Sequence, residues 1–320
     1  MNILVFGLGA LGTVYAASLK AAGHKVYAIT KERYLKDLGS GKVRVSGIWD
    51  SREAVLDGIF TDTGPLLEKE IDLVILTVKS FDTAHAVRQI KDLVKGDTLV
   101  LISQNGYGNY ETASLVLGRE HVLLARVIFG ARIIEVGYSE VTVIADDVKI
   151  GQPDEMVEEK RIVEIADAIR RAGIPASYAR DVYGLLWDKI LYNCALNPLG
   201  AIIGCSYGTL ADHEGSRHIM DRLIDEIFEV TGVHGIILRW ESPQAYKDHF
   251  YGKLIPPTRE HYPSMYYDIN AGKRVEIDAL NGAIVRLARK KGIQVPVNET
   301  ITDLIRTKEA ESLRRSSPVS

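Results

Sequence analysis

The feature that most constrains this chain is a glycine-rich turn, Gly7-x-Gly9-x-x-Gly12, which directly follows a short apolar run at residues 2–6. Helical periodicity and a second apolar run come next, and this order predicts the strand–turn–helix–strand unit of a parallel sheet. In that setting the first glycine permits the turn, the second lets a pyrophosphate approach the backbone, and the third lets the helix pack closely on the strand. Because the helix N-terminus then faces the phosphates, the pattern predicts a dinucleotide-binding site.

The first half of the chain continues this alternation. Ile71–Val78 and Thr98–Ile102 are apolar enough to be buried strands, and Phe81–Val94 between them has helical character. Three further β-like runs are expected to complete the sheet: Val122–Phe129, Val141–Ile144 and Val148–Ile150. We therefore expect a Rossmann-type, doubly wound α/β domain at residues 1–180.

The second half has a different pattern. A helix at Val157–Ala172, ended by Gly173 and Pro175, is predicted to connect the two halves. From about residue 181 the chain reads as almost entirely helical. Its long amphipathic segments lie near 183–197, 215–231, 274–291 and 298–314. We expect an all-α C-terminal domain at residues 181–320.

Composition excludes several classes of partner. The 320 residues include 39 basic and 42 acidic side chains, and a net charge of −3 gives no reason to expect nucleic acid or an anionic membrane as a partner. No basic leader and no long uninterrupted apolar run is visible, so we expect a soluble, cytoplasmic protein. The two cysteines, Cys194 and Cys205, exclude a disulfide framework. Eight histidines show no ligand spacing, so no metal site is expected.

The end of the second predicted strand bears on the cofactor. That strand ends at Thr30-Lys31-Glu32-Arg33. An acidic residue at this point usually binds the ribose hydroxyls of NAD, which Glu32 could do. Lys31 and Arg33 would instead pair with the 2′-phosphate of NADP. The two basic residues favour NADP(H), and the alternative for any one of them is a solvated charged loop.

The most informative segment of the second half carries a polar stripe on an apolar helix. Lys189, Asn193 and Asn197 stand at i, i+4 and i+8. The helix is expected to stop or kink at Asn197, because the following Pro198 disfavours the α conformation there. Asparagine is a poor helix former, so it would be an unusual choice for positions that are merely exposed to solvent. We therefore expect the stripe to line a cleft, and the alternative is that it lies on a solvated surface. A lysine ammonium can protonate a carbonyl oxygen and stabilise the developing alkoxide.

Two further positions accompany the stripe. A polar cluster at His261–Met265 and Arg274–Asp278 contains Glu276, which is predicted to open a helix, where the dipole favours a carboxylate. The alternative is an N-terminal charge with no further role. Cys194 lies on the apolar side of the stripe helix, so we expect it in the core rather than as a nucleophile.

These residues occur in the order and spacing of a known family. The shared motifs are Gly7-Leu-Gly-Ala-Leu-Gly12, Val78-Lys-Ser80, Gln104-Asn-Gly-x-Gly108, Trp187-x-Lys-x-x-x-Asn-x-x-x-Asn-Pro198, Ser264-Met265 and Glu276-Ile-Asp-x-x-Asn-Gly282. Together they resemble the ketopantoate reductase (2-dehydropantoate 2-reductase) family, from residue 1 to about residue 308. The resemblance implies NADPH-dependent reduction of 2-dehydropantoate to (R)-pantoate in pantothenate and coenzyme A synthesis. It also implies a helical C-terminal domain similar to that of 6-phosphogluconate dehydrogenase.

Carried over by position, the resemblance makes Lys189 the general acid and Glu276 a catalytic carboxylate that orients cofactor and substrate. Its substrate-binding residues are Asn105, Lys189, Asn193, Asn197 and Ser264. Its cofactor contacts are Gly7, Leu8, Gly9, Ala10, Leu11, Gly12, Lys31, Arg33, Lys79, Asn105, Ala131 and Glu276.

The chain departs from the family pattern at two places near the expected pocket. Cys205-Ser-Tyr207-Gly208 stands where many members have Cys-Pro-Asn-Gly, so one substrate-contacting amide is absent. Tyr266-Tyr267 replaces the usual Leu-Gln and adds bulk. Two alternatives therefore remain beside ketopantoate reduction: a reductase of another branched 2-oxo acid, and a non-catalytic NADP-sensing protein. The oligomeric state is open, with a homodimer as one option.

Overall fold

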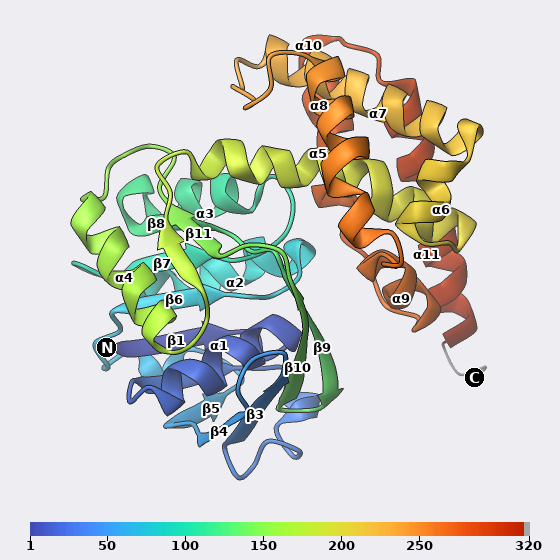
Figure 1. The fold of residues 1–320 in the computed structure, drawn as a ribbon. Coiled ribbons are helices and arrows are strands. Elements are labelled where there is room, and N and C mark those ends of the chain that lie inside the picture. The colour runs from blue at the N-terminus through green and yellow to red at the C-terminus, as the bar shows by residue number, and fades with distance from the viewer. Residues whose placement is uncertain (317–320) are drawn as a thin grey trace. The chain divides into compact units, whose positions relative to one another are not determined.

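The chain divides into two units, Met1–Tyr183 and Gly184–Ser320. They are seen in a computed structural model that describes residues 1–316 (Figure 1). The first unit combines strands and helices, and the second is helical. The predicted boundary stood between residues 180 and 181.

The first unit is built on a sheet of eight strands, counted within residues 1–316. In spatial order these are β12 (Ala176–Tyr178), β11 (Val148–Gly151), β8 (Val122–Arg126), β7 (Leu99–Ile102), β6 (Leu73–Leu76), β1 (Asn2–Phe6), β2 (Lys25–Ile29) and β5 (Gly58–Phe60). Neighbouring strands are parallel except β11, which is antiparallel to β8. The chain leaves β1 toward β2 and later returns to β6 on its other side, so a topological switch point lies at β1, where open α/β sheets bind ligands.

Helix α1 (Ala10–Ala21) lies between this sheet and a second, smaller one. The second sheet has the order β4 (Arg52–Val55), β3 (Lys42–Gly47), β10 (Tyr138–Ile144), β9 (Phe129–Glu135). Ile3 and Val5 of β1 belong to one buried core with Val14 of α1 and Val43 of β3. Helix α4 (Glu159–Arg171) contributes Ile165 to the same core.

The second sheet corrects one expectation. Val141–Ile144 was expected to complete the main sheet, but it belongs to β10, which pairs with β9 and β3. The predicted run Val122–Phe129 also divides, because β8 ends at Arg126 and β9 begins at Phe129. A short apolar run has the same period in either sheet, so periodicity does not specify its partner.

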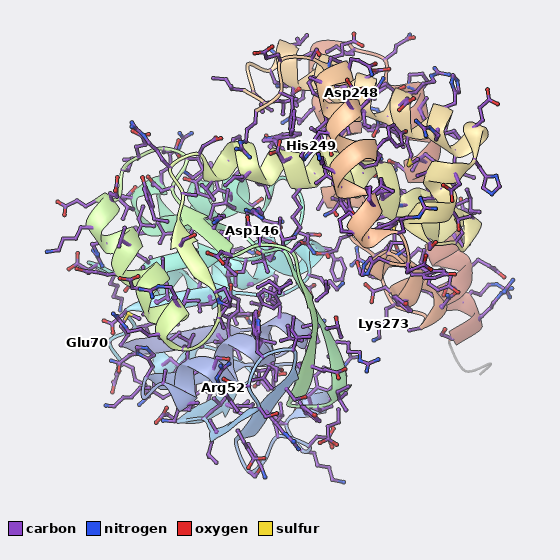
Figure 2. The ribbon with its side chains drawn as sticks, in the orientation of Figure 1. Arg52, Glu70, Asp146, Asp248, His249 and Lys273 are labelled. Atoms are coloured by element: carbon purple, nitrogen blue, oxygen red, sulfur yellow. The ribbon has the colours of Figure 1, made fainter. Side chains whose placement is uncertain are left out.

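One ion pair and one close contact link separate segments of the first unit. The buried Arg126, at the end of β8, donates to Asp146 before β11, with 2.6 Å between Nη2 and Oδ2. Arg52 of β4 packs its guanidinium on Gly173, just after α4. A Cβ at Gly173 would lie 2.2 Å from Nη2 of Arg52. Figure 2 labels Arg52 and Asp146 on the ribbon.

Two more helices complete the first unit. They are α2 (Thr83–Ile90) and α3 (Asn109–Leu117), and they pack on each other. Helix α2 is shorter than the predicted Phe81–Val94, because one-turn 3-10 helices at Ser80–Asp82 and Lys91–Leu93 flank it.

The second unit consists of helices joined by loops, with no strand among its described residues. Its helices are α5 (Val182–Ile203), α6 (Tyr207–Asp212), α7 (Glu214–Val233), α8 (Pro243–His249), α9 (Ser264–Asn270), α10 (Asn281–Lys291) and α11 (Pro296–Ser316). Helix α7 packs against α6, α8, α10 and α11. Within residues 1–316 no helix is long and apolar enough to cross a membrane.

Two helix boundaries differ from the prediction. The stripe helix was expected to stop or kink at Asn197, and it does not stop there, because α5 continues to Ile203 with Pro198 inside it. The helix predicted near 274–291 begins only at Asn281, and Glu276 instead precedes a one-turn 3-10 helix at Ile277–Ala279.

Candidate functional site

The glycine turn has the geometry that the sequence predicted. Gly7 adopts φ = +108°, and its N–H donates to Ile29 O at 2.9 Å, which ties the ends of β1 and β2 together. A Cβ at Gly12 would lie 1.9 Å from Gly7 O. Helix α1 can therefore lie this close to the turn after β1 only because residue 12 is a glycine. A Cβ at Gly9 would meet no atom within 4 Å. The middle glycine therefore faces open space at the N-terminus of α1, as a pyrophosphate would require.

Thr77 supports this turn and was not predicted. Its Oγ1 donates to Gly7 O at 2.7 Å and lies 3.2 Å from Phe6 O. A Cβ at Gly12 would also lie 2.6 Å from Thr77 Oγ1. The sequence feature that could have indicated this role is that Thr77 is a hydroxyl residue near the end of the segment 71–78, which is apolar apart from Asp72 and Thr77.

Strand register brings the other predicted cofactor positions to the same edge of the sheet. Phe6 is paired with Ile29 and Leu76, and Leu76 is paired with Ile102. The residues after these strand ends include the predicted cofactor contacts Gly7, Lys31, Arg33, Lys79 and Asn105. Carboxyl ends of parallel strands at a switch point are where such sheets bind nucleotides.

Two exposed cations follow β2. Lys31 Nζ lies 3.2 Å from Asp82 Oδ2, with 62% of the lysine side chain exposed. The Arg33 guanidinium lies 4.8 Å from the centroid of the Tyr34 ring. Glu32 between them is exposed as well. Both basic groups can therefore reach an anionic ligand at little desolvation cost.

A buried hydrogen-bond chain holds the loop of Asn105. Gln104 Nε2 donates to Thr83 Oγ1 at 2.5 Å, and Thr83 Oγ1 donates to Asn109 Oδ1 at 2.7 Å. Asn109 Nδ2 donates to Asn105 O at 2.8 Å. Gln104, Thr83 and Asn109 are buried and Asn105 is half-buried. The backbone of Asn105 is therefore anchored to α2 and α3, an arrangement that the sequence did not reveal.

Ala131 has a different setting from the other predicted cofactor residues. It lies on β9 of the second sheet, paired with Val141 of β10. Strand β9 packs against α1, whose N-terminus forms the glycine turn.

In the second unit, α5 carries the predicted polar stripe. Asn193 and Asn197 are only 9% and 8% exposed, and Lys189 is half-buried. The burial of both asparagines contradicts the alternative of a solvated stripe. Among residues 1–316, the Asn193 amide has no hydrogen-bond partner, whereas Asn197 Oδ1 accepts a hydrogen bond from the Tyr207 hydroxyl at 2.7 Å. The Asn193 oxygen and nitrogen are not among the fully buried unpaired polar atoms of residues 1–316, so the amide of this largely buried residue keeps some access to solvent.

The segment that leads to Ser264 packs against the end of α5. Tyr207 N donates to His261 O at 3.0 Å, and Gly208 N donates to Arg259 O at 2.8 Å. A Cβ at Gly200 would lie 3.0 Å from Pro263 Cγ, immediately before Ser264. Ser264 itself is exposed at the start of α9, so its hydroxyl is accessible near this packing.

Glu276 and Cys194 complete the predicted set. Glu276 is half-buried before the Ile277–Ala279 turn. Cys194 is fully buried in α5, and burial raises the pKa of its thiol, which disfavours a thiolate nucleophile.

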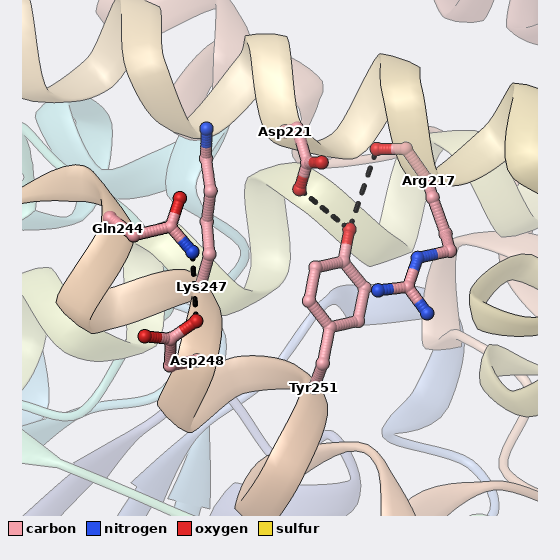
Figure 3. Close-up of a pocket in the computed structure, with 6 residues that line it drawn as sticks. All are labelled: Arg217, Asp221, Gln244, Lys247, Asp248 and Tyr251. Carbon is pink, nitrogen blue, oxygen red and sulfur yellow. Dashed lines mark hydrogen bonds between the residues drawn. The ribbon is translucent and has the colours of Figure 1, made fainter.

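A separate hollow in the helical unit contains none of the predicted residues (Figure 3). It has a volume of about 320 Å³, and its lining residues are Arg217, Asp221, Gln244, Lys247, Asp248 and Tyr251. Its polar groups pair with protein atoms: Tyr251 Oη donates to Asp221 Oδ1 at 2.8 Å, and Gln244 Nε2 donates to Asp248 Oδ1 at 2.8 Å. Because these polar side chains bond to one another, we interpret them as part of the structure of the helical unit.

Comparison with known proteins identifies both halves of the chain. Residues 3–155 match the family described as ketopantoate reductase PanE/ApbA, and residues 181–309 match its C-terminal counterpart. A protein from Aquifex aeolicus named 2-dehydropantoate 2-reductase is 43% identical over 316 residues, which cover 98% of this chain and 99% of that protein. A protein of the same name from Pyrococcus horikoshii is 30% identical and covers 97% of this chain and 98% of its own length.

Solved structures agree with the fold. A PanE/ApbA family ketopantoate reductase from Ralstonia eutropha is 28% identical, with a TM-score of 0.85 over 98% of this chain and 99% of that one. A D-mandelate dehydrogenase solved with NADH and anilino(oxo)acetate has a TM-score of 0.86 at 24% identity over 98% of this chain and 99% of that one, a likeness of fold. These neighbours confirm the predicted Rossmann-type unit followed by a helical unit. Ketopantoate reductases use NADPH, which confirms the predicted cofactor class. The chain therefore belongs to the ketopantoate reductase PanE/ApbA family of oxidoreductases.

Proposed function

We propose that this protein reduces 2-dehydropantoate (ketopantoate) to (R)-pantoate with NADPH, as a cytoplasmic step of pantothenate and coenzyme A synthesis. The observation that carries the proposal is Asn193, a residue nine-tenths buried whose amide is not fully buried and has no protein partner among residues 1–316, one helical turn from Lys189. Such a pair suits a small polar substrate with a carbonyl to protonate. The names of the Aquifex and Pyrococcus relatives, 2-dehydropantoate 2-reductase, support ketopantoate as the substrate.

The first unit supplies groups suited to the cofactor. The open space at Gly9 and the first-turn amides of α1, at Ala10, Leu11 and Gly12, fit a pyrophosphate. Lys31 and Arg33 fit a 2′-phosphate, because both are exposed cations at the end of β2. When bound, NADPH supplies the hydride.

Lys79, Asn105 and Ala131 are proposed to contact the rest of the cofactor, together with Leu8 in the turn. Lys79 follows the end of β6, which is paired with β1, and Asn105 follows the end of β7, which is paired with β6. Asn105 is also proposed to contact the substrate, and its anchored backbone holds it in place.

The second unit supplies the acid and the substrate contacts. Lys189 is proposed to donate a proton to the ketone oxygen and to stabilise the developing negative charge. Asn193, Asn197 and Ser264 would hold the carboxylate and hydroxyl groups of the substrate. Glu276 would orient cofactor and substrate.

A reductase of another branched 2-oxo acid is the second candidate. The specific observation in its favour is Tyr207, whose side chain stands where many family members present an amide. The fold does not decide between the two, since D-mandelate dehydrogenase shares it. The 43% identity to a 2-dehydropantoate 2-reductase favours ketopantoate.

The experiment is NADPH oxidation by the purified protein with ketopantoate and a panel of 2-oxo acids. The highest kcat/KM with ketopantoate supports the proposal. Turnover of another 2-oxo acid alone would retain the chemistry and replace the substrate. NADPH binding with no turnover across the panel would favour the NADP-sensing alternative. Sedimentation of the same sample tests the homodimer.

A further inference from the structure

We propose that Tyr207 is a positioning residue that fixes which side of the Asn197 amide faces the substrate. This inference rests on the proposed function and deepens it, because it names a determinant of substrate binding. The Tyr207 hydroxyl donates to Asn197 Oδ1, with 2.7 Å between the oxygens. Tyr207 thereby acts on the substrate through Asn197.

The surroundings of Tyr207 hold its side chain, and therefore its hydroxyl, in a fixed position. It is 3% exposed, and it begins α6. Its ring meets the Tyr192 ring edge-on, with 5.8 Å between centroids, and lies 5.2 Å from the His261 ring. Its backbone N–H donates to His261 O at 3.0 Å. The ring is therefore held by packing and the backbone by a hydrogen bond, so the hydroxyl has a defined position.

The direction of the hydrogen bond follows from the surroundings. Among residues 1–316, Asn197 Oδ1 is the one protein acceptor of the Tyr207 hydroxyl. If the amide were reversed, the phenol hydrogen would be buried without an acceptor, which is unfavourable. Burial also raises the pKa of Tyr207 well above its ordinary value, so the phenol keeps its proton. The Asn197 amide is consequently held with Oδ1 toward Tyr207 and Nδ2 away from it.

The consequence is that the Asn197 side chain favours one kind of ligand group. An amide has an acceptor oxygen and a donor nitrogen, and the oxygen of Asn197 is engaged by Tyr207. Asn197 therefore offers N–H donors to a ligand, which match the oxygens of a carboxylate. Asn193, one turn earlier on α5, keeps both its donors and its acceptor for a ligand, within the described part of the chain.

The test is Tyr207→Phe, which removes one oxygen and keeps the ring. We expect KM for ketopantoate to rise about five- to tenfold, the loss of one oriented hydrogen bond. The kcat and the Kd of NADPH should change by less than about twofold, because neither depends on the Asn197 amide. Tyr192→Phe is the matched control, since it removes a hydroxyl from the same aromatic cluster, where Tyr192 Oη lies 2.9 Å from Thr258 Oγ1. The control should keep the wild-type KM.

A double-mutant cycle separates positioning from general structure. In an Asn197→Ala background, Tyr207→Phe should have no further effect on KM, because the residue through which it acts is gone. An unchanged KM in Tyr207→Phe, or the same KM increase in the Asn197→Ala background, would overturn the inference. Failure of the wild-type chain to reduce ketopantoate would count against the proposed function alone, because the cycle can be run with the 2-oxo acid that it does reduce. A chain that neither binds nor reduces any 2-oxo acid would overturn both.

Discussion

The side-chain amide of Asn281 donates a hydrogen bond to the backbone carbonyl of Cys194, with 3.1 Å between Nδ2 and O. In a regular helix this carbonyl would accept the N–H of the residue four positions later. That residue is Pro198, which has no N–H. Asn281 therefore replaces the missing donor, and this explains why α5 continues to Ile203 instead of ending at Asn197.

Asn281 belongs to a buried chain that joins several helices of the second unit. Its Nδ2 also donates to Asn298 Oδ1 at 3.0 Å, and Asn298 Nδ2 donates to Glu226 Oε2 at 2.7 Å. The Glu226 carboxylate accepts the N–H groups of Val297 and Asn298 at 2.9 Å each. A carboxylate of α7 thus satisfies the first turn of α11. The backbone between Asn193 and Asn197 is anchored to this chain.

Asn281→Ala should lower the free energy of unfolding by about 2–4 kcal/mol, because it leaves the Cys194 carbonyl and Asn298 Oδ1 without their donor. Urea unfolding measures this. Pro198→Ala restores an N–H that can donate to Cys194 O, so the penalty of Asn281→Ala should be smaller in that background by about 1 kcal/mol. Purely additive effects would show that Asn281 does not substitute for the proline's missing N–H.

The glycine turn gives a pair of substitutions with different outcomes. Gly9→Ala places a methyl group where the protein has no atom within 4 Å, so stability should be unchanged while the Kd of NADPH rises about tenfold or more. Gly12→Ala places it 1.9 Å from Gly7 O, so stability should also fall, by about 1–3 kcal/mol. Titration calorimetry measures the Kd of NADPH, and thermal unfolding measures the stability of each variant. Wild-type NADPH affinity in Gly9→Ala would contradict the assigned pyrophosphate path.

How much of this arrangement the sequence predicts depends on how local each feature is. The β1–α1–β2 unit is local: the predicted run at residues 2–6 coincides with β1, and the second apolar run, expected after the helix, is β2. The second sheet is not local, since β10 pairs with β3 through Tyr138 and Arg44. No periodicity within either run specifies that pairing.

The same distinction holds at the site. The i, i+4 spacing is enough to place Lys189, Asn193 and Asn197 on one helix. The continuation of that helix depends on Asn281, 87 positions after Cys194. The bond from Thr77 to Gly7 likewise spans 70 positions. Such contacts appear only when the fold brings distant segments together.

Cofactor preference should depend on the two cations after β2. Replacing both Lys31 and Arg33 by alanine should lower kcat/KM for NADPH about 10- to 100-fold, because charge-assisted hydrogen bonds to the 2′-phosphate are lost. The kcat/KM for NADH, which lacks that phosphate, should change less than about twofold. Lys36→Ala removes an exposed charge nearby and serves as the control. Equal losses with NADPH and NADH would exclude a 2′-phosphate site here.

Asn193 should be important for activity and dispensable for stability. Asn193→Leu removes an amide that has no protein partner within residues 1–316 from a residue that is nine-tenths buried. The free energy of unfolding should therefore stay the same or rise by up to about 1 kcal/mol. The kcat/KM for ketopantoate should fall about tenfold or more. Lower stability together with a wild-type kcat/KM would make Asn193 a structural residue and remove the observation on which the proposed site depends.

The most direct measurement is the turnover of Lys189→Ala with NADPH and ketopantoate, together with its NADPH affinity. If Lys189 is the proton donor, kcat should fall about 10³-fold or more. The Kd of NADPH should stay within about threefold of the wild-type value, because the proposed cofactor contacts of the first unit are intact. A kcat within about tenfold of wild type would contradict the assignment of Lys189 and, with it, the mechanism built on the stripe of α5.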